Sequence, residues 1–294
     1  MDKNIRVFAS CHNHSNFSDA DYSPEKLVEI AHELGHGGFI LTDHDTVKGT
    51  YFTNKACRKL GMKSILGCEF TTYYGNRGVH LLGFDFNPDN KEMAELLAYG
   101  SGVQTSRSEV LFNMGLERGT LREGVTWQDV RDDFPYNDYL CVDQVFRSMV
   151  NRGIYTLEEY DDFRMPNFSY KLGLEDKVRE ITGMSYCDIS TERAIKTILA
   201  AGGVPVVAHP RGYARFAEDF IKMGAMGFET RFPRCDAEDF EFFEKLCEER
   251  GLYKMGGSDH SGILGGLGGG GDCSYEQLGI TEEDFMMIYE RRLG

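Results

Sequence analysis

Nine side chains of the types that bind metal ions follow, or lie within, short apolar segments that the sequence predicts to be β-strands. Six of the eight histidines belong to this set, which a random distribution of histidines would not produce. In a β/α barrel the carboxyl ends of the strands meet at one mouth. The pattern therefore predicts a multinuclear metal site at such a mouth, and an enzyme. The nine residues are His12, His14, Asp19, His44, Glu69, His80, His209, Asp259 and His260.

Apolar segments rich in β-branched residues predict seven strands. They lie at residues 5–10, 38–42, 63–68, 78–84, 204–210, 226–230 and 253–260. Residues 88–188, by contrast, carry helical patterns and an acidic, tyrosine-rich portion. We therefore predict an α/β protein in which residues 1–87 and 189–294 form a seven-stranded β/α (TIM-like) barrel and residues 88–188 form an inserted, mostly helical subdomain.

Capping residues predict where helices of the barrel begin. Ser23 followed by Pro24 predicts a helix start after the first strand. Thr281, with Asp284 three residues later, predicts a capping box that opens the last helix. Further helices are predicted at about 47–60, 191–203, 214–223 and 236–251. Strands and helices thus alternate on both sides of the middle region.

Composition limits the partners. The formal net charge is −15 and no basic patch is evident, so the chain lacks the positive surface that binding of long duplex nucleic acid requires. No segment approaches the ~20 apolar residues that span a bilayer. The start of the chain has no cleavage signature, and the eight cysteines include no CxxC pair, which together predict a cytoplasmic protein.

The ligand types indicate which metals and which chemistry to expect. Imidazole with carboxylate suits Mn, Fe or Zn, and nine ligands exceed the needs of one ion, so two or three divalent ions are predicted. Glu69 can bridge two ions, and clustered ions activate water and neutralise phosphoryl charge. His209, or a metal-bound water, can protonate the leaving oxygen. Glu69 and His209 are therefore the predicted catalytic residues.

Some positions also allow simpler interpretations. Asp19 lies in a loop, where an acidic residue can cap a turn, and Asp21 is a nearby competitor. His80 lies within a predicted strand, so it can also be a buried histidine bonded to a carbonyl. Glu229 ends a predicted strand without a partner in any recognisable pair, so it is at most a residue that supports a ligand.

Six stretches closely resemble the PHP (polymerase and histidinol phosphatase) family. They are CHNHSNFSDAD, LTDHDTVKG, LGCEF, VHLLGF, AAGGVPVVAHPRGY and GGSDHSG. The arrangement is most similar to stand-alone bacterial PHP phosphoesterases with a helical insertion. This resemblance implies a distorted seven-stranded β/α barrel, a two- or three-metal centre and phosphoester hydrolysis, in some members of 3′,5′-bisphosphonucleotides or short RNA ends. The implied ligands are His12, His14, Asp19, His44, Glu69, His80, His209 and Asp259.

The last motif departs from the family pattern. The family usually has a histidine two residues after the aspartate, whereas Asp259 is followed at once by His260. Adjacent side chains of an extended segment point in opposite directions, so Asp259 is the expected ligand and His260 the weaker candidate. The resemblance also implies a basic segment near the start of the insertion that binds substrate phosphate. Here Arg107 is the best candidate from that segment, and Arg211 is a second candidate.

The predicted function is metal-dependent hydrolysis of a small phosphomonoester by metal-bound hydroxide, with a nucleotide or a 3′,5′-bisphosphonucleotide among the candidate substrates. One alternative is a histidinol-phosphate-type phosphatase. Another is a metal-binding PHP module without activity, although the near-complete ligand set argues against loss of function. A metal-dependent hydrolase of other bonds is a further alternative; such enzymes often use a carbamylated lysine, and no lysine ends a predicted strand here.

Overall fold

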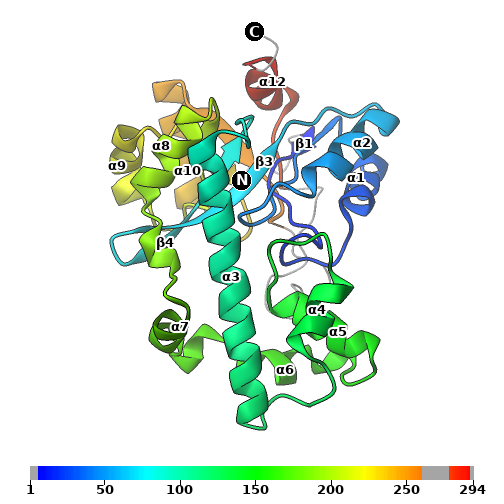
Figure 1. Ribbon diagram of the computed structural model, residues 1–294. Helices are drawn as coiled ribbons and strands as arrows, with labels where there is room; N and C mark the ends of the chain where they lie inside the picture. Colours follow the sequence, from blue (N-terminus) through cyan, green and yellow to red (C-terminus); the bar gives the residue numbers. More distant parts are fainter. Residues whose placement is uncertain (1–5, 260–277, 292–294) are drawn as a thin grey trace.

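The strands of the computed structural model, which describes residues 6–259 and 278–291, form two sheets. Short parallel strands β1 and β2 form one sheet, and β3 to β7 form the other in chain order (Figure 1). The strands are β1 (Ala9–Ser10), β2 (Gly38–Phe39), β3 (Gly67–Tyr74), β4 (Arg77–Phe84), β5 (Val204–Val207), β6 (Gly227–Arg231) and β7 (Tyr253–Gly256). The predicted α/β class is confirmed, and each predicted strand overlaps an observed one, but β3 was expected at residues 63–68 and instead begins at Gly67 and runs to Tyr74.

A single closed seven-stranded barrel is not confirmed. Among the described residues, isolated backbone contacts join the two sheets, such as the His12 carbonyl that accepts the Asp259 N–H at 3.0 Å. The Asn13 side chain lies where β1 and β2 end: its amide donates to the carbonyls of Ser10 (3.2 Å) and Ile40 (2.8 Å).

Strand β4 reverses direction, which the predicted barrel did not include. It forms an antiparallel hairpin with β3 and also pairs antiparallel with β5, while β5, β6 and β7 are parallel. In this register His80 of β4 lies opposite Thr71 of β3. Residues 77–80, the amino-terminal half of β4, therefore pair with residues 71–74, the carboxyl half of β3.

Helices cover the sheets on their outer faces (Figure 1). The first two pack on β2 through a small apolar core that includes Leu27, Phe39 and Leu41. The helices of this part are α1 (Pro24–Glu33), α2 (Thr50–Leu60), α8 (Thr191–Ala200), α9 (Ala217–Met223), α10 (Ala237–Arg250) and α12 (Glu282–Arg291), with a 3-10 turn η4 (Ala214–Phe216). The predicted caps are present: Ser23 accepts from the Lys26 N–H, and Thr281 accepts from the Asp284 N–H.

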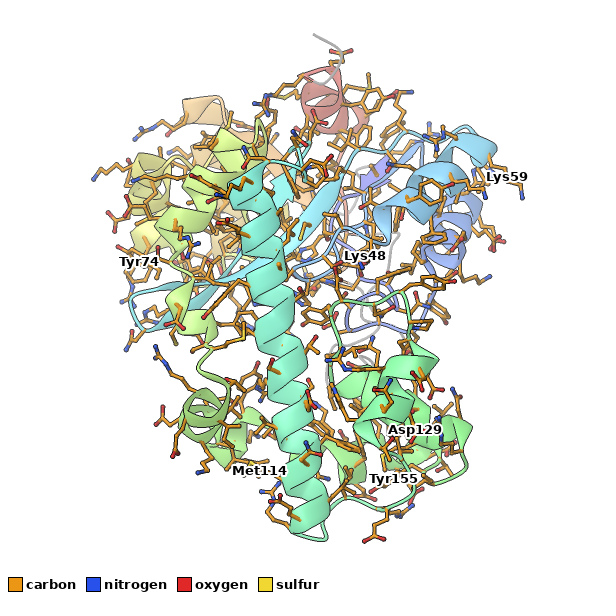
Figure 2. All side chains as sticks on the ribbon, in the orientation of Figure 1. Lys48, Lys59, Tyr74, Met114, Asp129 and Tyr155 are labelled. Carbon is orange, nitrogen blue, oxygen red and sulfur yellow. The ribbon has the colours of Figure 1, made fainter. Side chains whose placement is uncertain are left out.

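Residues between β4 and β5 are helical, as predicted. They form α3 (Lys91–Glu117), α4 (Trp127–Asp133), α5 (Val142–Asn151), α6 (Tyr160–Asn167) and α7 (Glu175–Thr182), with 3-10 turns η1 (Leu157–Glu159), η2 (Tyr170–Leu172) and η3 (Tyr186–Asp188). Met93 at the start of α3 packs in the core of the larger sheet, while Phe112 further along packs in a second core with Phe146 and Phe163. Figure 2 shows Met114, Asp129 and Tyr155 in this second part. Its description as a separate subdomain stays a prediction.

Helix α3 is 27 residues long, but it is not apolar enough to cross a bilayer. The same holds for every other helix in the described ranges.

Candidate metal centre

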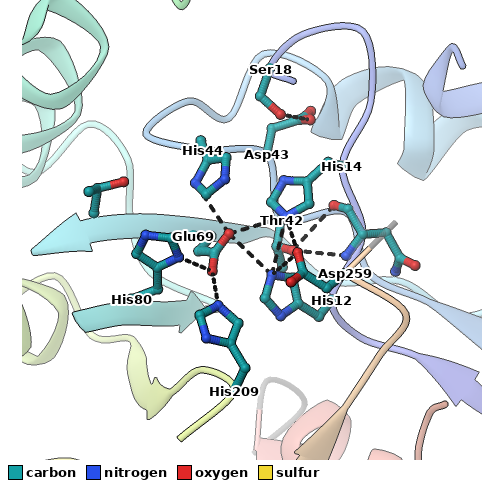
Figure 3. A network of polar contacts seen from close by, with 12 residues as sticks. His12, His14, Ser18, Thr42, Asp43, His44, Glu69, His80, His209 and Asp259 are labelled. Carbon is teal, nitrogen blue, oxygen red and sulfur yellow. Dashed lines mark hydrogen bonds and ion pairs between the residues drawn. The ribbon is translucent and has the colours of Figure 1, made fainter. Parts of the chain in front are cut away.

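The carboxylate of Glu69 lies inside a cluster of imidazoles (Figure 3). Its Oε2 atom is 3.1 Å from Nε2 of His12 and from Nε2 of His14, and 3.2 Å from Nδ1 of His44. The carboxylate is completely buried. One carboxylate oxygen does not need three imidazole nitrogens as hydrogen-bond donors. Their convergence is instead typical of side chains that bind shared cations.

The second carboxylate oxygen of Glu69 faces two further imidazoles. Its Oε1 atom is 2.9 Å from Nδ1 of His80 and 3.1 Å from Nε2 of His209. Glu69 is the third residue of β3, not the residue after a strand as predicted. It reaches the cluster because its backbone pairs with the segment after β2: the Asp45 N–H donates to the Glu69 carbonyl at 2.8 Å.

Two aspartates complete the cluster. Asp259 Oδ1 lies 3.0 Å from Nε2 of His14 and 3.5 Å from Nε2 of His12. The carboxylate of Asp19 lies 3.6 Å from His14 Nδ1 through one oxygen and 3.6 Å from His44 Nε2 through the other. Asp19 is thus the most loosely held of the predicted ligands.

Three overlapping groups of these side chains could each hold a metal ion. They are His12, His14, Glu69 and Asp259; His14, Asp19 and His44; and His44, Glu69 and His80. His209 joins the cluster through Glu69. Eight of the nine predicted ligands therefore lie together, and their roles as ligands stay predictions. His260 lies outside the described residues.

The electrostatics of the cluster favour bound cations. Burial lowers the pKa of His12 and of His14, but carboxylates that include Glu69 and Asp259 raise it more, so both pKa values lie well above the usual range. Burial alone would raise the pKa of Glu69, but His12, His44 and His80 hold it well below its usual value. The buried carboxylates stabilise positive charge within the cluster. That charge can be carried by protonated histidines or by bound divalent ions.

Unsatisfied buried atoms support the same interpretation. Glu69 Oε2, His14 Nδ1 and His44 Nδ1 are buried, and despite the short distances around Glu69 none has a described partner in hydrogen-bond geometry. Buried polar atoms almost always have a partner. Burial also lowers the pKa of His44 to about 4, which keeps this imidazole neutral, as a metal ligand must be. The residues present therefore fit a metal centre.

Backbone strain appears at two of the predicted ligands. His209 has a φ angle of 27° and Asp259 one of 46°, in the left-handed region that residues other than glycine seldom adopt. A Cβ atom on Gly257 would lie 2.3 Å from the backbone nitrogen of His12. Gly257 therefore permits the close approach that brings Asp259 to His12. Strain of this kind is often found at functional sites.

Glu229 is more important to the site than its sequence context indicated. Its Oε2 atom lies 3.0 Å from His12 Nδ1 and accepts the backbone N–H of His209 at 2.6 Å. The first contact leaves Nε2 of His12 directed at Glu69, and such support for a ligand fixes its tautomer and orientation. Local sequence could not reveal this role, because Glu229 is 217 positions from His12.

We predict that Glu229→Ala weakens metal binding by about 10- to 100-fold, the usual effect of losing a residue that orients a ligand. Glu229→Gln should have a smaller effect, because its amide oxygen can still accept from both nitrogens. Equilibrium binding of Mn²⁺ to the two variants measures the difference. Equal affinities in Glu229→Ala and the unaltered protein would show that His12 is oriented without Glu229.

Two cavities open beside the cluster, and His80 lines both. The first, of about 390 Å³, is lined by five of the predicted ligands and by two exposed arginines, Arg211 and Arg234. Arg211 was a predicted phosphate-binding residue, whereas Arg234 was missed. The second, of about 350 Å³, is lined by Arg107 and by aromatic side chains that include Tyr73 and Tyr170.

Arg107 lies in this second cavity but is already paired. Its guanidinium contacts Glu175 through Nη2 at 2.8 Å and through Nε at 3.1 Å, and it stacks on the ring of Tyr170 at 4.1 Å. The side chain is 6% exposed. Arg107 thus lines a cavity that His80 also lines, but a substrate phosphate there must share the guanidinium with Glu175.

Comparisons with known proteins agree with the resemblance seen in the sequence. Residues 10–113 match the PHP domain family. The chain is 27% identical to a 5′-3′ exoribonuclease of Haemophilus influenzae, over 84% of this chain and 88% of that protein. It is 25% identical to a 3′,5′-nucleoside bisphosphate phosphatase of Chromobacterium violaceum, over 84% and 85%. The solved structure of a candidate metal-dependent phosphoesterase from Bifidobacterium adolescentis has the same fold, with a TM-score of 0.72, 23% identity and 96% coverage of both chains.

Proposed function

This chain carries a PHP domain, and on that premise we propose that it is a metal-dependent phosphoesterase. The observation that carries the proposal is the position of Glu69, whose two oxygens lie within 3.2 Å of nitrogens from five imidazoles. One carboxylate shared among overlapping ligand groups can hold ions close enough to act on one phosphate. We propose two or three divalent ions of Mn, Fe or Zn.

Bound ions would supply Lewis acidity and activate water for attack on phosphorus. The protein's own side chains would hold the substrate. Arg211 and Arg234 line the cavity beside the ligands, and in a chain with a net charge of −15 they provide local positive charge for a phosphate. A guanidinium binds phosphate oxygens in bidentate fashion, which positions the ester as well as attracting it.

The predicted proton donor, His209, has two competing roles. The nitrogen that faces Glu69 is Nε2, at 3.1 Å, and a nitrogen that binds a metal cannot also carry a proton to the leaving group. We propose that Nε2 of His209 either binds a metal ion or donates a proton to the leaving group. It does not do both in the same reaction step. The His209 backbone N–H donates to Glu229, so the main chain is held in place for either role.

The proposed substrate is a small phosphomonoester with an aromatic group, such as a nucleotide or a 3′,5′-bisphosphonucleotide. Support comes from the second cavity, which shares His80 with the first and is also lined by Tyr73, Tyr170 and Arg107. Aromatic walls suit a planar base. The relative from Chromobacterium violaceum is a phosphatase of 3′,5′-nucleoside bisphosphates, which agrees with this class.

A second candidate is hydrolysis at the 5′ end of short RNA, favoured by the similarity to the Haemophilus influenzae exoribonuclease. The decisive experiment measures phosphate release from bisphosphonucleotides, mononucleotides and histidinol phosphate, and nucleotide release from short 5′-phosphorylated RNA, with the same metal-loaded protein. We expect the highest kcat/KM for a bisphosphonucleotide. Preference for RNA or for histidinol phosphate would replace the proposed substrate, and no turnover of any phosphate ester would overturn the proposed activity.

Arg107→Ala should impair hydrolysis of a bisphosphonucleotide far more than that of p-nitrophenyl phosphate, which has no second phosphate for the guanidinium to bind. The expected differential is roughly 1.5–3 kcal/mol, the scale of a hydrogen bond to a charged group. Kinetic constants for both substrates measure it. Arg118→Ala is the control, because Arg118 caps the far end of the same helix. Equal losses on both substrates would mean that Arg107 only holds Glu175 and the fold.

A further inference from the structure

The loop that carries Asp19 is attached to the sheet by one buried carboxylate. Asp43, which follows β2, accepts hydrogen bonds from the Ser15 backbone N–H at 2.6 Å, the Ser15 hydroxyl at 2.8 Å and the Ser18 hydroxyl at 2.7 Å. Ser18 directly precedes Asp19. This side of the loop is therefore held by residues close to the predicted ligand His44.

The opposite side of the same loop is held by the helical region. The Asn137 amide donates to the Asn16 carbonyl at 2.7 Å. The Gln144 amide donates to the Ser18 carbonyl and lies 3.4 Å from the Asn16 carbonyl. The Cys141 thiol also contacts the Ser18 carbonyl, at 3.7 Å. Residues 137–147 thus satisfy backbone carbonyls on both sides of Phe17.

An ion pair also joins the helical region to this loop. Arg147 of α5 pairs with Asp21, whose side chain is 3% exposed. By contrast, the side chain of Asp19, which lies in the loop between Ser18 and Asp21, is 32% exposed. It approaches His14 and His44 only to 3.6 Å. Among the predicted ligands Asp19 therefore depends most on its own loop for its position.

We propose that residues 137–147 act as a clamp that sets the position of Asp19, with Gln144 as the central positioning residue. The group formed by His14, Asp19 and His44 then assembles fully only while the clamp holds the loop. This inference rests on the proposed metal centre, and it gives the helical region a role in metal binding that is separate from any contact with substrate.

Gln144 allows a sharp test because its two amide atoms have different roles. Its Oε1 accepts the Cys141 N–H at 2.9 Å at the start of α5, while its Nε2 donates to the loop. Glutamate at this position keeps the acceptor that caps the helix. It lacks the N–H donors and places negative charge against two carbonyl oxygens. Gln144→Glu therefore removes the clamp contact while preserving the cap.

Gln128→Glu is the matched control. Gln128 is exposed on α4, and its amide donates to Asp132 of the same helix at 2.8 Å, its one hydrogen bond within residues 6–259 and 278–291. The substitution makes the same chemical change and the same change in net charge far from the loop. Both variants are compared with the unaltered full chain in two experiments: hydrogen exchange of residues 15–21 in metal-free protein, and titration with Mn²⁺ in which free Mn²⁺ is followed by EPR.

In Gln144→Glu we expect faster exchange in residues 15–21 and about 10- to 100-fold weaker binding of the most weakly bound Mn²⁺ ion, the range found when support for a ligand is lost. Tighter-bound ions should be affected less, and Gln128→Glu should match the unaltered protein. Asn137→Asp, which removes the donor to Asn16, repeats the test if Gln144→Glu does not fold.

The outcomes separate the clamp from the metal centre. If the unaltered protein binds no Mn²⁺, Fe²⁺ or Zn²⁺, the proposed metal centre is wrong, and the clamp proposal with it. If the unaltered protein binds metal but the folded variant shows the same exchange and the same affinities, the clamp proposal alone is overturned.

Discussion

Replacing Glu69 with glutamine should reduce phosphate-ester hydrolysis by about a thousandfold, because clustered ions supply several kcal/mol of transition-state stabilisation and each 1.4 kcal/mol is a factor of ten in rate. An amide is neutral and offers one oxygen, so it bridges ions poorly. It would also turn an N–H group toward some of the five imidazole nitrogens that lie within 3.2 Å of the present carboxylate. Loss of shared ions, or of their spacing, should follow.

The measurement is kcat/KM with metal content determined on the same sample. Glu249→Gln serves as the control, since Glu249 is exposed on α10 and, in the described part of the chain, its ion pair is with Lys245 one turn away, at 3.7 Å. The Glu69 variant should keep its circular dichroism spectrum, because no described apolar core depends on this carboxylate. Near-normal turnover with full metal occupancy would show that Glu69 is not a bridging ligand and that the metals lie elsewhere in the cluster.

Removing the metals with a chelator should leave a folded protein without measurable hydrolysis. The reason is that neither the imidazoles nor the arginines of the site can by themselves generate a strong nucleophile at neutral pH, whereas bound divalent ions can. Protein purified without chelator should contain at least about two equivalents of Mn, Fe or Zn, since a dinuclear centre is the minimum for this chemistry. Elemental analysis before and after stripping measures this directly.

Stability should change together with activity. An ion whose free concentration is a hundred times its Kd stabilises the folded state by about 2.7 kcal/mol. The melting temperature should therefore fall when the metals are removed and recover when Mn²⁺ is added. The Glu69→Gln variant should show a smaller shift on the same treatment. Full activity of the metal-free protein would refute the proposed mechanism, and the phosphoesterase would then need a different nucleophile.

The helical elements and the positions of the strands were predictable because they depend on local sequence. Ser23 and Thr281 cap helices through contacts within three residues. The apolar segments of β4 to β7 form strands close to where they were expected, and the helical patterns between β4 and β5 form helices. Periodicity, capping and composition act over a few residues, so they can be read without knowledge of the fold.

The gathering of the predicted ligands was also predictable, although their exact placement was not. Histidines and carboxylates near predicted strand ends indicated that His12, His44, Glu69 and His209 meet, and in the structure they do. The reason given for Glu69 was wrong, because it lies inside a strand. His80 reaches the cluster because β4 runs antiparallel to β3, and an apolar segment does not encode its own direction.

The sequence by itself thus determined the ligand types, their order along the chain and most local elements. Only the tertiary structure decided which groups face each other: Glu229 with His12, Glu175 with Arg107, and Gln144 with the loop that carries Asp19. These contacts join residues 217, 68 and 126 positions apart. The physical reason is that a hydrogen bond or ion pair depends on distances of about 3 Å, which are set by packing and strand register, and no local pattern of residues records them.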